Sequence, residues 1–155
     1  MSHPIELHNV TKTYGDFRAV DDVSFSVPAG TVCGFLGPNG AGKTTCIRMM
    51  LDILRPTSGS VSILGTPRAL DVRARIGYLP EEKGLYKKMT AASIIAYFAM
   101  LKGVPSAKAK KTARELLERY GLGSFQDHKC EALSKGMGQK VQVLASIAHD
   151  PDLVI

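Results

Sequence analysis

The amino-acid sequence predicts an α/β fold in which a mostly parallel sheet is flanked by helices. Three features support this fold class. Alternating apolar and polar residues open the chain, a compact apolar run then passes directly into a glycine-rich loop and a helix, and helical periodicity dominates the second half. Strands that alternate with helices in this way build a mainly parallel sheet.

The first part of the chain is predicted to consist mainly of strands. Residues 5–10 and 20–27 alternate apolar and polar side chains, which is the period of a half-buried strand. Residues 31–36 form a compact apolar run, as expected for a buried parallel strand. Two short strands are also expected, at residues 60–64 and 76–79.

Helices are expected after the glycine-rich loop and between residues 90 and 120. The first should end near Leu54, because a turn containing proline and glycine follows it. Thr90 and Ser106 stand where their side chains can cap the N-termini of two later helices.

Glycines mark the ends of those two later helices. Gly103 and Gly121 fit the position just past a helix C-terminus, where a left-handed backbone is common. A last helix is predicted over residues 136–149. It leads into the apolar residues 153–155, which are expected to begin another buried strand.

The glycine-rich loop carries the strongest chemical signal. Residues 37–44 match the pattern G-x-x-x-x-G-K-[ST] in full, and a strand pattern precedes them while a helix pattern follows. Glycines let backbone N–H groups surround phosphates, Lys43 places a charge on the β- and γ-phosphates, and the Thr44 hydroxyl ligates Mg²⁺. The predicted nucleotide site consists of Gly37, Pro38, Asn39, Gly40, Ala41, Gly42, Lys43, Thr44 and Thr45.

A second motif narrows the class of nucleotide-binding protein. Residues 133–137 read Leu-Ser-Lys-Gly-Met and precede the last predicted helix. This segment resembles the Leu-Ser-Gly-Gly-Gln signature of ATP-binding-cassette (ABC) proteins. The amino-acid sequence of residues 37–45 is also typical of that family. The order of the motifs resembles an ABC ATPase over essentially the whole chain. Residues 79–89 resemble the sodium- and drug-extruding exporters.

The resemblance implies a P-loop NTPase core with an N-terminal antiparallel β subdomain and an α-helical subdomain. Residues 1–84 and 136–155 would form the β subdomain and the core, and residues 85–135 the helical subdomain. ATP and Mg²⁺ are the implied cofactors. Two cassettes of this family pair head to tail, so the implied partners are a second ATPase subunit, identical or a paralogue, and a transmembrane permease.

The signature segment is expected to close over the ATP held by the other subunit. Ser134 would donate its hydroxyl and Gly136 would let the backbone approach the γ-phosphate. Lys135 and Met137 depart from the family pattern, and Lys135 either adds a cation near that phosphate or points to solvent. The alternative is that Ser134 is an ordinary N-cap on an amphipathic helix.

The resemblance adds an adenine site and a second metal ligand. Tyr14 stands where the family has an aromatic residue that stacks on adenine, and Val20 would complete the apolar cleft. Glu81 occupies the position of a glutamine that touches Mg²⁺ in the family. A carboxylate oxygen suits Mg²⁺, while the alternative for Glu81 is a solvated acidic turn.

No catalytic residue is assigned in the sequence. The resemblance places the Walker B aspartate and its adjacent glutamate directly after residue 155, and a switch histidine later still. His149 and residues 150–152 are interpreted as a surface connection and not as substitutes. We therefore expect a truncated cassette that binds ATP without hydrolysing it, and that is marginally stable or aggregates alone.

Composition limits the class of protein, its expected partners and the state of its cysteines. The 155 residues are 45% hydrophobic and 22% charged, and neither a secretory signal nor a membrane-spanning run is evident. Lysines in the middle third raise the net charge to +6, but no nucleic-acid motif accompanies them, so nucleic acid is not an expected partner. Cys33, Cys46 and Cys130 lack metal-ligand spacing and are expected to be buried, reduced thiols.

The leading hypothesis is the ATPase subunit of a membrane exporter, located in the cytoplasm on the inner face of the cell membrane. A soluble ABC-type ATPase of translation or DNA repair is the first alternative, although such proteins usually carry tandem cassettes or long insertions. An unrelated phosphate-loop kinase or GTPase is the second, and Tyr14 and the signature segment argue against it.

Overall fold

The computed structural model describes residues 3–80 and 86–155. The chain divides into two compact units, Met1–Arg73 and Ala74–Ile155. The subdomain boundaries expected from the sequence, at residues 84 and 136, remain a prediction. Glu81 lies outside the described residues.

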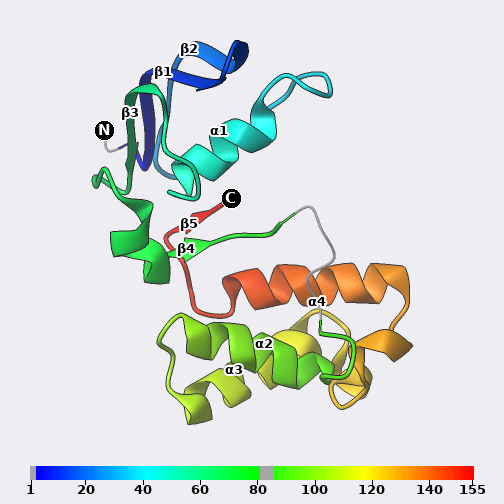
Figure 1. Ribbon diagram of the computed structural model, residues 1–155. Coiled ribbons are helices and arrows are strands. Elements are labelled where there is room, and N and C mark those ends of the chain that lie inside the picture. The colour runs from blue at the N-terminus through cyan, green and yellow to red at the C-terminus, as the bar shows by residue number, and fades with distance from the viewer. Residues whose placement is uncertain (1–2, 81–85) are drawn as a thin grey trace. The chain divides into compact units, whose positions relative to one another are not determined.

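The first unit is built on a three-stranded antiparallel sheet in the order β2-β1-β3 (Figure 1). Its strands are β1 (Ile5–Tyr14), β2 (Phe17–Val27) and β3 (Ser58–Ile63). A tight turn joins β1 to β2, so that Tyr14 pairs with Phe17 across the hairpin. The antiparallel β subdomain expected from the sequence is therefore present, with longer strands than the alternating segments indicated.

Helix α1 (Lys43–Met50) is the one α-helix among the described residues of the first unit. Cys46, Met49 and Met50 give it a buried face. The predicted end near Leu54 is wrong by about one turn. Asp52 has a left-handed backbone with φ of 58°, and the Leu54 amide reaches back to the carbonyl oxygen of Arg48 over 3.1 Å. This pattern of hydrogen bonds ends a helix.

The predicted buried strand at residues 31–36 is not formed in this structure. The segment pairs with none of the described strands, and the side chains of Val32 and Leu36 are 103% and 91% exposed. Cys33, which was expected to be buried in that strand, is exposed as well. An apolar run becomes a strand only where neighbouring strands accept and donate its backbone hydrogen bonds, and β2-β1-β3 does not do so here.

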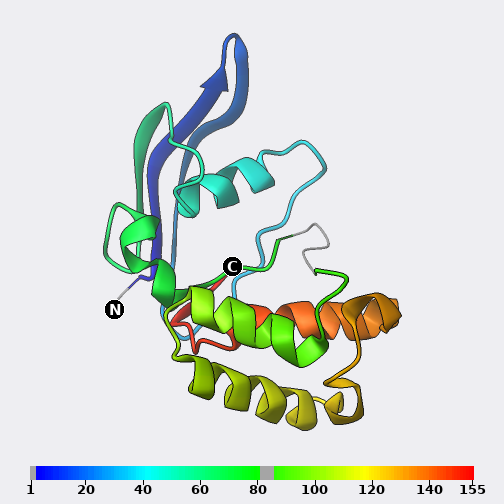
Figure 2. The same ribbon diagram turned by 60° about the horizontal axis from the view of Figure 1, so that its bottom comes forward.

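Outside residues 81–85, the second unit contains a short parallel pair of strands and three α-helices. Strand β4 (Ile76–Gly77) pairs with β5 (Leu153–Val154), which confirms a strand at the end of the chain. The helices are α2 (Ala91–Leu101), α3 (Ser106–Arg119) and α4 (Lys135–Ile147). They lie side by side in Figure 2 and form one apolar core, with Ile94, Ile95, Leu117, Val141 and Leu144 buried among them.

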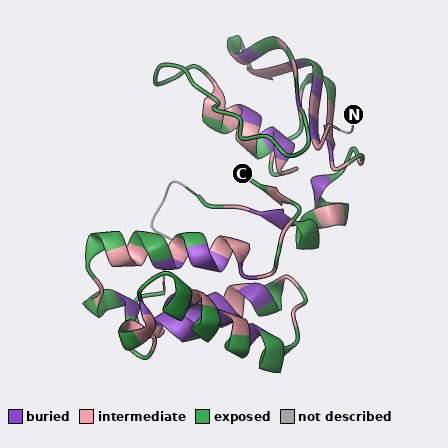
Figure 3. Ribbon diagram, turned by 180° about the vertical axis from the view of Figure 1, so that it is seen from behind, coloured by how far each residue is buried: buried purple, intermediate pink, exposed green. Residues whose placement is uncertain are grey.

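Short 3₁₀ segments complete the described elements. They are Ala69–Arg75 ahead of β4, Gly123–Phe125 after α3, and Cys130–Ala132 ahead of α4. Figure 3 shows that α3 and α4 have both buried and exposed faces, as amphipathic helices require, whereas most of α2 is buried or half-buried. No helix within the described ranges is long and apolar enough to cross a bilayer.

The predicted helix ends are largely confirmed. The side chain of Thr90 caps α2 by accepting a hydrogen bond from the Ser93 amide, 3.2 Å away. Gly103 and Gly121 follow α2 and α3 with φ angles of 93° and 74°. The prediction for Ser106 is wrong, because Pro105 takes the N-cap position of α3 and Ser106 is its first helical residue.

Candidate functional site

The phosphate loop (residues 37–44) connects an extended segment to the first turn of α1. Gly40 and Gly42 have φ angles of 82° and 81°, a left-handed conformation that glycine adopts readily and other residues do not. The amide of Ala41 donates to the carbonyl oxygen of Pro38 over 3.3 Å, which closes a turn inside the loop. The backbone thus curls directly ahead of a helix N-terminus, an arrangement that binds anions.

The ammonium group of Lys43 folds back onto this loop. Its Nζ donates hydrogen bonds of 2.7 Å to the carbonyl oxygens of both Gly37 and Pro38. Both acceptors are neutral carbonyl groups, whereas a phosphate oxygen carries negative charge and attracts an ammonium group more strongly. The structure therefore holds a cation against the loop, where phosphate oxygens would be stronger partners for it.

Two threonines follow Lys43 in the first turn of α1. Thr44 is exposed, and Thr45 is half-buried. Mg²⁺ in nucleotide sites takes one or two protein oxygens and completes its shell with phosphates and water. The accessible hydroxyl of Thr44 fits that role. Within the described ranges no cluster of three or more His, Cys, Asp or Glu side chains is placed to hold a metal alone.

The phosphate loop packs against strand β2 through Gly42. A Cβ atom at position 42 would overlap the carbonyl oxygen of Ala19 and would lie 3.1 Å from Cγ2 of Val20. Val20 is 5% exposed. The structure thus brings Val20 into direct contact with the phosphate loop, and the role of Val20 beside an adenine ring stays a prediction.

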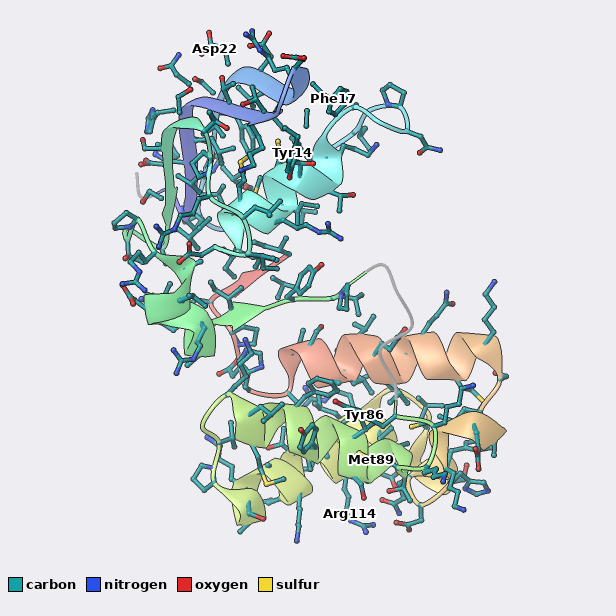
Figure 4. All side chains as sticks on the ribbon, viewed as in Figure 1. Tyr14, Phe17, Asp22, Tyr86, Met89 and Arg114 are labelled. Atoms are coloured by element: carbon teal, nitrogen blue, oxygen red, sulfur yellow. The ribbon has the colours of Figure 1, made fainter. Side chains whose placement is uncertain are left out.

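Tyr14 ends β1 on the sheet that supports the loop (Figure 4). Its side chain is 49% exposed. Lys12, two residues earlier, pairs with Val20 across the β1–β2 ladder. The Nζ atom of Lys12 lies 5.2 Å from the centroid of the Tyr14 ring. An exposed aromatic ring, Val20 and the phosphate loop therefore occur together in the first unit.

Sequence reasoning missed two residues near this site. Lys12 touches the Tyr14 ring, and Phe17, 65% exposed, pairs with Tyr14 across the hairpin turn. The signal for Lys12 was its spacing, because residues i and i+2 of a strand point to the same face. The signal for Phe17 was an aromatic residue directly after the Gly15-Asp16 turn.

The signature segment lies in the second unit at the start of α4. Ser134 is the N-cap, and its Oγ accepts a hydrogen bond from the Met137 amide over 3.3 Å. Lys135 and Gly136 are exposed, whereas Met137 packs against the helical core. The hydroxyl of Ser134 accepts in this cap, so its proton remains able to donate to another group. Capping and phosphate contact are therefore compatible roles for Ser134.

His149 and residues 150–152 connect α4 to β5, as expected, but the His149 side chain is only partly exposed. It is half-buried, and its Nε2 lies 3.1 Å from the carbonyl oxygen of Ile76. Its Nδ1 is buried without a hydrogen-bond partner among the described residues. Burial lowers the pKa of His149 below its usual value, with a smaller lowering by Lys102 and opposing contributions from Ile76 and Asp150.

An apolar cavity of about 330 Å³ lies beside His149 in the second unit. It is lined from the end of β4 by Tyr78, Leu79 and Pro80, from α2 by Phe98 and Leu101, and from α4 by Ala145. A cavity of this size is large enough for a bulky side chain or a small ligand.

Comparison with known proteins identifies the family. The family model described as ABC transporter matches residues 20–155. Over 151 residues the chain is 43% identical to the uncharacterized ABC transporter ATP-binding protein YhaQ of Bacillus subtilis (strain 168), covering 97% of this chain and 51% of that protein. It is 37% identical to the daunorubicin/doxorubicin resistance ATP-binding protein DrrA of Streptomyces peucetius, covering 97% and 46%.

Solved structures agree with these matches. One, described as the ATP binding subunit of an ABC transporter, superposes with a TM-score of 0.84 at 29% identity, over 97% of this chain and 64% of the other. A second, cbiO1 from Clostridium perfringens, has a TM-score of 0.85 at 21% identity, over 99% and 64%, and supports the fold alone.

The matches confirm the resemblance that the motifs indicated. The chain spans about half the length of the curated relatives it matches, at 51% of YhaQ and 46% of DrrA. The ABC transporter ATP-binding protein NatA of Bacillus subtilis (strain 168) is a further relative, at 38% identity over 89% of this chain and 58% of NatA. The chain therefore belongs to the ABC transporter family, and its relatives in that family are ATP-binding proteins.

Proposed function

We propose that this chain forms the nucleotide-binding part of the ATPase subunit of an ABC exporter. The observation that carries the proposal is the phosphate loop, where the Lys43 ammonium lies 2.7 Å from the carbonyl oxygens of Gly37 and Pro38. A cation and a left-handed glycine backbone ahead of α1 suit a triphosphate. ATP binding in the whole protein would couple to transport through a separate permease.

The nucleotide would extend from the phosphate loop toward Tyr14. Backbone N–H groups of residues 39–44 bind the phosphates, Lys43 neutralises their charge, and Tyr14 stacks on the adenine ring above Val20. Mg²⁺ bound through Thr44 would supply charge neutralisation of the β- and γ-phosphates. Glu81 is a second candidate ligand for the ion.

A second copy or a paralogue would complete the site. Ser134 at the N-terminus of α4 has a hydroxyl able to donate, and the exposed Lys135 and Gly136 leave the helix end accessible. A helix N-terminus favours an anion. We infer that this end of α4 meets the γ-phosphate held by the other subunit, so that ATP binding closes the dimer and hydrolysis by the complete protein reopens it.

A role in transport is supported by the names of the relatives, which describe ABC transporter ATP-binding proteins and, in one case, a drug-resistance protein. The cavity of about 330 Å³ is lined in part by Pro80, the residue directly before Glu81, and by residues of α2. An apolar side chain from a membrane-embedded partner would suit this cavity. With the permease bound at this cavity, the cytoplasmic protein would lie on the inner face of the cell membrane.

ATP-dependent association tests the proposal. Sedimentation of the purified protein with ATP, ADP and GTP should show a larger species with ATP alone, under conditions that prevent hydrolysis. Ser134→Ala should weaken association while leaving ATP affinity within about twofold, because Ser134 acts on the partner's nucleotide. Preference for GTP, or transfer of phosphate to an acceptor, would instead favour a GTPase or kinase.

A second experiment separates the exporter from a soluble ABC-type ATPase. The tagged protein is expressed in its own cells, cross-linked and purified from membranes and from the soluble fraction. Recovery with a multi-span membrane protein supports the exporter. Recovery with ribosomes or DNA, and not with membranes, would overturn the exporter in favour of the soluble alternative.

A further inference from the structure

We propose that Lys12 is a positioning residue for adenine recognition, which holds the Tyr14 ring from one face so that the opposite face is presented to the base. This inference rests on the proposed function, because it assumes that Tyr14 stacks on the adenine of ATP. It concerns a residue that neither the phosphate-loop pattern nor the signature segment includes.

Lys12 is anchored by two contacts at its ammonium group. Its Nζ lies 5.2 Å from the centroid of the Tyr14 ring, within the range of a cation–π interaction. The same atom donates a hydrogen bond of 2.7 Å to the carbonyl oxygen of Arg55. Arg55 lies between α1 and β3, so the lysine side chain bridges β1 to the connection that follows α1.

Backbone hydrogen bonds fix the strand from which Lys12 projects. The Thr57 amide donates to the Thr11 carbonyl oxygen over 2.8 Å, and the Thr13 amide donates to Oγ1 of Thr57 over 3.1 Å. These two bonds flank Lys12 on both sides. The lysine therefore approaches the ring from a fixed backbone, and its position is not set by a freely rotating side chain alone.

Lys12, which contacts the Tyr14 ring, is linked to the phosphate loop through Val20. Lys12 pairs with Val20 across the ladder, and Val20 lies against Gly42 of the loop. Tyr14 is still 49% exposed, so much of its surface remains available to a ligand. Stacking of a base on a tyrosine ring that is already held in place costs less side-chain entropy than stacking on a ring that must first be immobilised.

Lys12 also differs from a cation that binds phosphate directly. Its ammonium is occupied by the Arg55 carbonyl and the Tyr14 ring, whereas Lys43 is the ammonium placed on the loop itself. Loss of the Lys12 charge should therefore affect the base end of the nucleotide and spare the phosphate end. This difference separates a positioning role from general electrostatic attraction.

The test compares ATP with inorganic tripolyphosphate, which has the phosphates and no base, by titration calorimetry with Mg²⁺. Lys12→Met keeps the apolar stem and removes the charge, so ATP affinity should fall about fivefold while tripolyphosphate affinity stays unchanged. Lys12→Arg, which retains a cation and a donor, should restore ATP affinity. Lys108→Met, an exposed site on α3, is the matched control and should change neither ligand.

A double-variant cycle completes the experiment. In a Tyr14→Ala background, Lys12→Met should weaken ATP binding no further, because the ring it positions is gone. Equal loss for ATP and tripolyphosphate, or an undiminished effect in the Tyr14→Ala background, would overturn the proposal. If Lys12→Met does not fold, Lys12→Gln serves for the same comparison. Failure of the unsubstituted protein to bind ATP would instead overturn the proposed function.

Discussion

The backbone of Gly42 lies directly against the carbonyl oxygen of Ala19, which leaves no room for a side chain at position 42. This contact joins the phosphate loop to strand β2. Glycine is therefore needed at position 42 for two reasons: a Cβ atom would overlap the Ala19 carbonyl oxygen, and the backbone is left-handed, with φ of 81°.

Gly42→Ala is therefore expected to lower the free energy of unfolding by more than the cost of a left-handed alanine, which is about 1–2 kcal/mol. The added methyl group overlaps a backbone atom, and backbone is harder to displace than a side chain. Urea denaturation followed by circular dichroism measures the effect. Gly30→Ala is the matched control, because φ is 73° there and no described atom would lie within 4 Å of the new Cβ. Equal losses for the two variants would contradict the contact.

Helix capping gives a second prediction. Ser134→Ala and Thr90→Ala should each lower the free energy of unfolding by about 1 kcal/mol, because each side chain accepts a hydrogen bond from the third amide of its helix. Ser106→Ala is the control and should stay within about 0.5 kcal/mol, since Pro105 occupies the cap of α3. A loss at Ser106 as large as the other two would show that the assigned start of α3 is wrong.

The caps show what the sequence predicts well. Thr90, Ser134, Gly103 and Gly121 act on residues within one helical turn, so their local pattern is sufficient. The positions of the helices in the second unit were likewise indicated by helical periodicity. The family resemblance added the β and helical subdomains, and the comparisons bear it out.

Features that depend on distant neighbours were not predictable. The apolar run at 31–36 has the composition of a buried strand, but composition cannot supply a pairing partner, and Val32 and Leu36 are exposed. The contact between Lys12 and the Tyr14 ring depends on χ angles and on Arg55, which is 43 residues away in the sequence. The contact of the His149 ring with a backbone carbonyl depends on Ile76, 73 residues earlier.

Cysteine reactivity tests the placement of residues 31–36. Cys33 is exposed, whereas Cys46 and Cys130 are buried, and burial raises the pKa of both buried thiols. One thiol per chain should therefore react quickly with Ellman's reagent near neutral pH, and the other two only on unfolding. Cys33→Ser should remove the fast reaction, and Cys46→Ser should leave it. The absence of a fast thiol would support the buried strand that the sequence predicted.

His149 should make the second unit sensitive to acid. Burial places the pKa of folded His149 below the ordinary value of 6.5, so the unfolded chain takes up a proton first as pH falls. The stability that neutral His149 contributes is fully present above about pH 6.5 and is lost as pH falls through the lower folded pKa. His149→Gln should reduce the decline in unfolding free energy between pH 7.5 and 5.

The control for this pH dependence is His128→Gln, because His128 is exposed and takes part in none of the ion pairs found among the described residues. That variant should retain the full decline between pH 7.5 and 5. If His149→Gln and the unsubstituted protein lose stability in parallel, then His149 does not account for the acid sensitivity.

The affinity of the Lys43→Ala variant for ATP tests the central claim most directly, measured by titration calorimetry with Mg²⁺ beside the unsubstituted protein and Lys110→Ala. Lys43 is the cation held on the phosphate loop by Gly37 and Pro38, so its loss should weaken ATP binding by about 2–3 kcal/mol, or roughly 30- to 150-fold. Lys110→Ala should leave the affinity unchanged. Equal ATP affinities in the Lys43→Ala variant and the unsubstituted protein would contradict the account.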